Sequence, residues 1–172
     1  MIKKNRQQGF TLIELLVVIS IIAFLAAATM LVLSQSRSKS RNTTRLADIN
    51  SIRKSLDLFY LNCGAYPINT SAITLSSSYS LYTGTGSSCG NKDGSSSVNG
   101  GFGTVANGAG NIIIKQLKSA PLPADGNCTG PENDYTYSSP SDGSTYTLTF
   151  CLGAKTGDYP LGVRTATEKG IQ

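Results

Sequence analysis

The sequence of 172 residues contains no histidine. This absence removes the commonest general base and the commonest zinc ligand from the chain at once. The sequence also lacks a nucleophile motif and a phosphate-binding glycine loop followed by lysine, and residues 100–103 (GGFG) have the composition of a loop, not of a dinucleotide fingerprint. We therefore expect a protein that is not an enzyme.

Glycine and proline are missing from residues 10–33, and Glu14 is the one charged residue among these 24. At ~1.5 Å per residue, a helix of this length spans roughly 36 Å, which is enough to cross the hydrocarbon core of a bilayer. Lys3, Lys4 and Arg6 precede the segment. The net charge of +5 is concentrated in the first third of the chain, because residues 61–172 carry six cations and seven anions. The basic balance therefore does not indicate a nucleic-acid-binding head.

Paired cysteines of the C-x-x-C type are absent, which argues against a metal site built from all four thiolates. Four cysteines behind a long apolar segment suggest two disulfides and an oxidising compartment. Of the three possible connectivities we favour Cys63 with Cys89 and Cys128 with Cys151. Each pair would close a loop of some 25 residues, for which loop-closure theory gives about 3 kcal/mol.

Residues 9–14 (GFTLIE) follow the N-terminal cations and open the apolar run. This pattern resembles the leader and cleavage site of type IV pilins and type II secretion pseudopilins. A weaker match, residues 56–60 (LDLFY) with residues 64–67 (GAYP), is similar to the segment in which the pilin helix ends. The resemblance implies that residues 1–9 are a leader, cut between Gly9 and Phe10 by a prepilin peptidase that also methylates the new amine of Phe10. The alternative is an uncleaved signal anchor.

Glu14 is a carboxylate inside an apolar helix, where an unpartnered charge costs several kcal/mol. We expect no partner for it in the uncleaved chain. Cleavage creates an α-amino cation on Phe10, one helical turn away, and the resemblance implies that Glu14 pairs with the Phe10 amine of a neighbouring subunit. Such a pair would favour one stagger between packed helices. The alternative is a carboxylate that reaches the lipid interface.

The apolar run continues into a second segment with helical periodicity. Its apolar positions recur every three or four residues: Leu46, Ile49, Ile52, Leu56, Phe59 and Cys63. We expect one helix over residues 10–62, with a membrane or filament-core part (10–33) and an amphipathic stem (34–62), ended by Gly64 and Pro67. The alternative is a break within residues 34–44, whose helix propensity is poor.

Residues 63–172 are expected to form a disulfide-bonded head, and the whole chain an α+β pilin-like fold in which a small antiparallel sheet lies on the stem. About half of residues 76–110 are Gly or Ser, which indicates a long surface loop with at most short strand or turn pieces. Residues 112–117 (IIIKQL) suggest a short helix ended by Pro121. Alternating, β-rich segments predict strands at residues 135–137, 146–152 and near 161–165, with a turn at 139–143.

Two surface sites are further hypotheses. The oxygen-bearing side chains of Asp125, Asn127, Glu132 and Asp134 suggest a calcium site, as some pseudopilins have; the alternative is ordinary turn chemistry. Four cations spaced along the stem suggest a basic stripe that attracts DNA: Arg37, Lys39, Arg41 and Arg45. The alternative is a solvated junction, or pairing with Asp48 and Asp57 of neighbouring subunits.

The resemblance implies a structural subunit of a type IV pilus-like filament, inserted in the cytoplasmic membrane as a single-pass prepilin with its head outside. Its partners would be identical or related subunits, the prepilin peptidase, an assembly platform protein and an ATPase, and the product an extracellular or cell-envelope pilus. The alternatives are a pseudopilin of a type II secretion system, a competence-type pilin that binds DNA, and a membrane-anchored binding domain that never polymerises.

Overall fold

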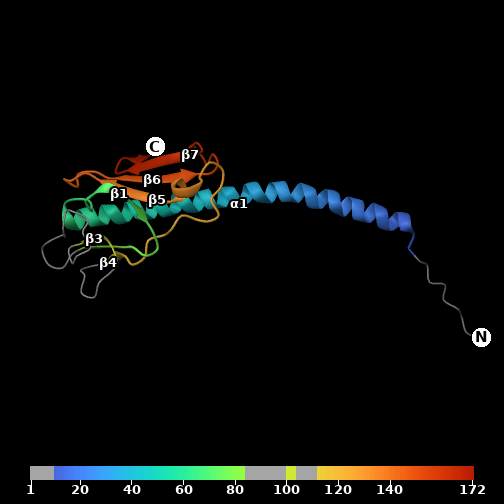
Figure 1. Cartoon of the computed structure of the whole chain (residues 1–172), viewed down its shortest axis with the longest axis horizontal. Coiled ribbons are helices and arrows are strands. Elements are labelled where there is room, and N and C mark those ends of the chain that lie inside the picture. The colour runs from blue at the N-terminus through green and yellow to red at the C-terminus, as the bar shows by residue number, and fades with distance from the viewer. Residues whose placement is uncertain (1–9, 84–99, 104–111) are drawn as a thin grey trace, which may run out of the picture. The chain divides into compact units, whose positions relative to one another are not determined.

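The computed structural model describes residues 10–83, 100–103 and 112–172. The chain divides into an N-terminal unit, Met1–Arg37, and a head unit, Ser38–Gln172 (Figure 1). In chain order the elements are α1 (Leu12–Cys63), β1 (Asn69–Leu75), β2 (Ser80–Thr83), β3 (Gly100–Gly103), β4 (Ile112–Ile114), the 3₁₀ helix η1 (Gly130–Asn133), β5 (Tyr135–Ser139), β6 (Thr147–Leu152), β7 (Gly162–Thr167) and β8 (Gly170–Ile171). The predicted α+β class is confirmed.

Helix α1 runs without interruption through residues 34–44, where poor propensity had suggested a break. It ends as predicted at Gly64, whose φ of +70° is the left-handed conformation typical of a helix C-terminus. The backbone N–H of Gly64 donates to the carbonyl oxygen of Tyr60 at 2.7 Å, which satisfies one of the helix's last free carbonyls.

The main sheet is antiparallel, has five strands in the order β1-β5-β6-β7-β8, and lies over the head part of α1 (Figure 1). Leu148 in β6 pairs with Tyr137 on one side and with Ala166 on the other, and all three side chains are fully buried. The alternation of buried and partly exposed residues along β5 is that of a sheet with one face on a core. Strands β5, β6 and β7 were predicted, whereas β1 and β8 were not.

The core of the head forms where this sheet meets one face of α1. The helix contributes Ile49, Ile52, Leu56 and Phe59, each at most 4% exposed, with Leu46 and Cys63 partly buried beside them. These are the six positions that the helical periodicity selected. Full burial of an apolar side chain of this size stabilises a fold by about 1.5–3 kcal/mol.

A second antiparallel sheet has the strand order β3-β2-β4. It corrects one prediction. The short helix expected at residues 112–117 is instead strand β4, because three successive β-branched isoleucines favour an extended chain, and Ile114 pairs with Leu81 of β2. Within residues 76–110, the short strands β2 and β3 agree with the short strand pieces expected there, and Leu81 is fully buried. Residues 84–99 and 104–111 lie outside the described part of the chain.

Candidate functional site

The apolar start of α1 has no cover within the described part of the chain. Every described side chain from residue 10 to residue 30 is exposed; Phe10, Leu12 and Phe24, for example, are 92%, 82% and 75% accessible. By length and composition, α1 is able to cross a membrane. A helix that is apolar on all sides is suited to lipid or to a bundle of like helices, and not to water.

Glu14 has a partner inside its own chain. Its Oε2 accepts hydrogen bonds from the backbone N–H of Thr11 at 2.9 Å and from the Thr11 hydroxyl at 2.7 Å, while the N–H of Glu14 donates to Thr11 Oγ1 at 3.3 Å. This reciprocal arrangement is a capping box, which satisfies otherwise free donors at a helix N-terminus. The expectation that Glu14 lacks a partner before cleavage is therefore wrong. The T-x-x-E spacing of residues 11–14 was the signal that sequence reasoning missed.

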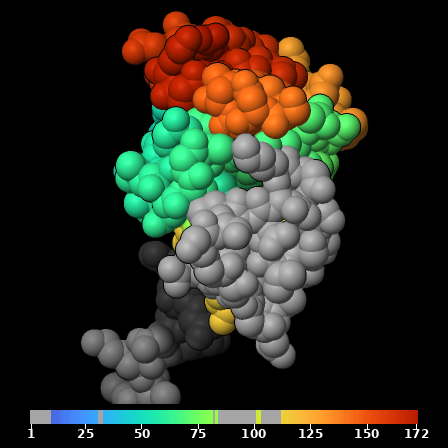
Figure 2. Space-filling view, turned by 90° about the vertical axis from the view of Figure 1, so that its left-hand side faces the viewer, coloured from blue at the N-terminus to red at the C-terminus, as the bar shows by residue number. Residues whose placement is uncertain are grey.

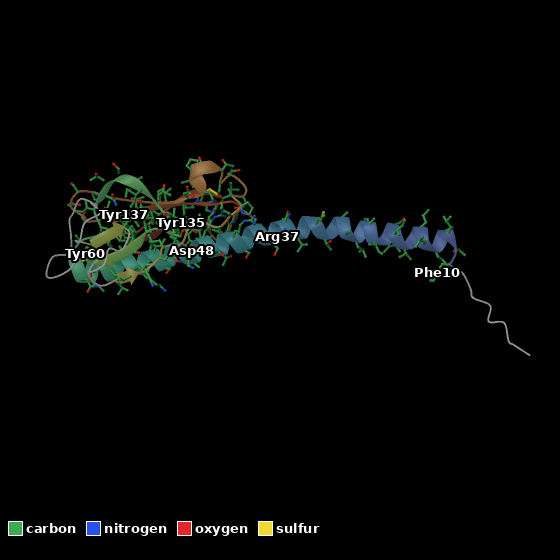
Figure 3. The ribbon with its side chains drawn as sticks, turned by 60° about the horizontal axis from the view of Figure 1, so that its bottom comes forward. Phe10, Arg37, Asp48, Tyr60, Tyr135 and Tyr137 are labelled. Atoms are coloured by element: carbon green, nitrogen blue, oxygen red, sulfur yellow. A yellow bond between two sulfur atoms is a disulfide. The ribbon has the colours of Figure 1, made fainter. Side chains whose placement is uncertain are left out.

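The capping box leaves Glu14 able to bind a cation. A carboxylate has about four acceptor positions, and Thr11 fills two of them. Phe10 lies at the start of the helix, one turn from Glu14, with its side chain exposed (Figure 3). Gly9, the other side of the predicted cleavage point, lies outside the described residues.

Two of the four cations predicted to form a basic stripe are already paired with a carboxylate inside the head. Arg45 is fully buried, and Arg41 and Arg45 both form ion pairs with Asp125, at 2.9 and 2.8 Å. Only Arg37 and Lys39 of the four cations are exposed side chains without such a pair among the described residues. The reason is a long-range contact, because the segment between β4 and η1 carries the Asp125 carboxylate to the helix face on which Arg41 and Arg45 lie.

The same ion pairs occupy the predicted calcium ligand Asp125. Burial alone would raise the pKa of Asp125, but hydrogen bonds from Arg45, Ser38 and Arg41 outweigh burial and lower that pKa below its usual range. Glu132 and Asp134 are exposed. Nowhere in the described ranges do three or more His, Cys, Asp or Glu residues gather as metal ligands. Asp125 is thus engaged by two arginines, and a calcium site at Asp125, Asn127, Glu132 and Asp134 stays a prediction.

A disulfide joins Cys128 to Cys151, with their Cα atoms 5.6 Å apart and both residues fully buried. It fastens the segment before η1 to strand β6 and is one of the two pairs favoured from the sequence. Cys63 is also disulfide-bonded. Cys89, its expected partner, lies outside the described residues.

Figure 2 shows the head from the end at which α1 stops, with the last strands (red) above the blue-green C-terminal turns of the helix.

Parts of this chain are similar to known proteins. The prokaryotic N-terminal methylation motif matches residues 4–30. Type II secretion system core protein G of Aeromonas hydrophila is 35% identical over 65 residues, which are 38% of this chain and 46% of that protein. The type IV wide pilus major component PilA4 of Thermus thermophilus is 38% identical over 66 residues, 38% of this chain and 50% of that protein. The chain thus spans about half the length of these relatives.

One relative matches over a longer stretch of the chain. Fimbrial protein Q of Moraxella bovis is 33% identical over 108 residues, which cover 63% of this chain and 68% of that protein. No solved structure is significantly similar to the chain. A match over more than two thirds of a fimbrial protein, together with the methylation motif at the N-terminus, shows that the chain belongs to the family of type IV pilins and type II secretion pseudopilins.

Proposed function

We propose that the protein is a structural subunit of a type IV pilus-like filament. It enters the membrane as a precursor, is cut between Gly9 and Phe10, is methylated on the Phe10 amine, and polymerises through residues 10–33. The observation that carries the proposal is the apolar start of α1, exposed on every side and interrupted by the single carboxylate of Glu14. In a filament, neighbouring copies of the same helix would cover this surface.

Glu14 is proposed to change partners during assembly. In the precursor it caps its own helix through Thr11. After cleavage the positively charged amine of Phe10 appears one turn away, and in the filament Glu14 pairs with the Phe10 amine of a neighbouring subunit. Apolar packing between helices in lipid provides little discrimination between staggers, since lipid tails are as apolar as leucine. A buried charge left unpaired costs about 3–5 kcal/mol, so the ion pair selects one stagger.

The head is proposed to lie outside the cytoplasmic membrane, with α1 crossing it once. The disulfide between Cys128 and Cys151 supports an oxidising compartment for the head. A prepilin peptidase would supply the cleavage, and an assembly platform and ATPase the work of polymerisation. In this scheme the chain is their substrate and not itself an enzyme.

A pseudopilus of a type II secretion system is the second candidate, because a relative named for that system matches 38% of the chain. The longer match with fimbrial protein Q, over 63% of the chain, favours a pilus. DNA binding through the stem is not proposed, because Arg41 and Arg45 are engaged by Asp125.

Mass spectrometry of the mature chain tests the processing step. We expect an N-terminus at methylated Phe10 in cells that contain the prepilin peptidase, and a start at Met1 in cells that lack it. A variant with Gly9→Leu serves as the matched control and should remain uncut. A chain that keeps Met1 in the presence of the peptidase would contradict the proposal.

A further inference from the structure

The guanidinium of Arg45 is buried inside the head, where its two terminal nitrogens donate to three oxygen atoms while its Nε has no partner among the described residues. Its NH1 donates to Asp125 Oδ1 at 2.8 Å and to Asn42 Oδ1 at 2.6 Å, and its NH2 donates to Asn133 Oδ1 at 2.8 Å. Arg45, Asn42 and Asn133 are at most 3% exposed, and the Asp125 side chain is 9% exposed. One carboxylate and two amide oxygens thus converge on one cation.

These contacts join three separate segments of the head. The first segment is α1, which carries Asn42 and Arg45. The second is the segment before β5, in which Asp125 precedes η1 and Asn133 is its last residue. The third is the chain just after β6, which Asn42 binds. There, Asn42 Oδ1 accepts from the N–H of Gly153 at 3.1 Å, and its amide donates to the carbonyl oxygen of Ala154 at 3.0 Å. Gly126 permits the close approach of loop and strand end, since a Cβ at this residue would collide with the Gly153 carbonyl.

Carboxylate and amide oxygens are the ligands that calcium prefers, so the chemistry of this cluster is that of a cation site. The cation, however, is part of the chain. We propose that the Arg45 guanidinium is a built-in cation, which holds the loop of residues 125–134 on α1 in the place of a metal ion and makes the head independent of calcium. Arg41 completes the arrangement by occupying the second oxygen, Oδ2, of Asp125 at 2.9 Å.

The planar fork of a guanidinium is essential to this role. It distributes its N–H donors over three acceptors that are fixed on different segments, whereas an ammonium is a compact point charge with another geometry. Replacing Arg45 by alanine removes the cation and leaves the three oxygens around an empty space. A small alkylguanidinium added to the solution should enter that space and restore part of the lost stability.

The test follows thermal unfolding of the full chain in detergent micelles by the near-ultraviolet circular dichroism of its tyrosines. We expect the wild-type Tm to be the same in millimolar calcium and in EDTA. Arg45→Ala should lower the Tm by on the order of 10 °C or more, because it leaves Asp125 buried beside fewer donors. Methylguanidinium should recover part of that loss, and methylammonium distinctly less.

Leu148→Ala is the matched control, because it opens a cavity in the apolar core away from the cluster and should not respond to methylguanidinium. If Arg45→Ala does not fold, Arg45→Lys, which keeps the charge without the fork, should fold with a smaller loss of Tm. The proposal is overturned by a calcium-dependent rise of the wild-type Tm, by an unchanged Tm in Arg45→Ala or Arg45→Lys, or by equal rescue of Leu148→Ala. These readouts concern the head alone and do not depend on filament formation.

Discussion

The hydroxyl of Tyr135 donates a hydrogen bond to Oδ2 of Asp48 at 3.2 Å and so joins strand β5 to α1. Tyr135 is fully buried, while Asp48 is half-buried. Burial raises the pKa of Asp48, and the hydrogen bond from Tyr135 and the charge of Lys118 oppose this shift without cancelling it. Figure 3 shows Asp48 and Tyr135 in the head.

Asp48→Asn should therefore stabilise the head slightly at pH 7. Because the folded-state pKa of Asp48 is raised, the folded protein loses stability as the pH climbs from about 4 through that pKa, and an amide does not ionise. The amide oxygen still accepts from Tyr135. We expect a gain below about 1 kcal/mol, measured as a higher Tm at pH 7 but not at pH 3. A lower Tm at pH 7 would show that the charge of Asp48 is favourable.

The contribution of Asp125 to the stability of the head should have the opposite pH dependence. Its folded-state pKa is lowered, so the stability that it contributes is present above its unfolded value near 4 and is lost as the pH falls through the folded value. Tm measured from pH 7 to pH 2 should fall in the acid range for the wild type. Asp125→Asn should start from a lower Tm at pH 7 and show a shallower acid loss; equal acid slopes in both proteins would refute the assignment.

Much of this architecture follows from periodicity, and the exceptions have local causes. Helix α1, its end at Gly64 and strands β5 to β7 were predictable because their patterns extend over many residues. Strand β4 was mistaken for a helix because three isoleucines are too short a run to show a period. At the candidate site, Glu14 was predictable as the lone charge of residues 10–33. Its capping partner Thr11 could have been predicted from the T-x-x-E spacing. The pairing of Arg45 with Asp125, 80 residues away, was not predictable, because only the folded loop brings them together.

Tyr137→Phe should destabilise the head by about 1–2 kcal/mol. The buried Tyr137 hydroxyl donates to the carbonyl oxygen of Pro67 at 2.6 Å, and its loss leaves that carbonyl without this donor. Tyr60→Phe is a suitable control, because the Tyr60 side chain is 41% exposed and its ring can keep its contact with Tyr66. Chemical denaturation should show a lower midpoint for Tyr137→Phe alone; equal midpoints would argue that the buried bond contributes nothing.

Replacing Cys128 and Cys151 together by serine should cost about 3 kcal/mol, because the unfolded chain is then no longer closed over 23 residues. The loss should appear as a lower midpoint of urea unfolding under oxidising conditions. Adding a reductant should lower the midpoint of the wild type by more than that of the double variant. A double variant as stable as the oxidised wild type would rule out this contribution.

The central claim is most directly tested by shearing surface filaments from cells that express the wild-type chain or Glu14→Ala, and by identifying and quantifying the subunit in them by mass spectrometry. We predict wild-type filaments built from chains that begin at methylated Phe10. Glu14→Ala should be cut normally but give at least about tenfold fewer filaments, because an unpaired Phe10 amine in an apolar core costs several kcal/mol. Mature wild-type chains that remain single in the membrane, or Glu14→Ala filaments at the wild-type yield, would contradict the account.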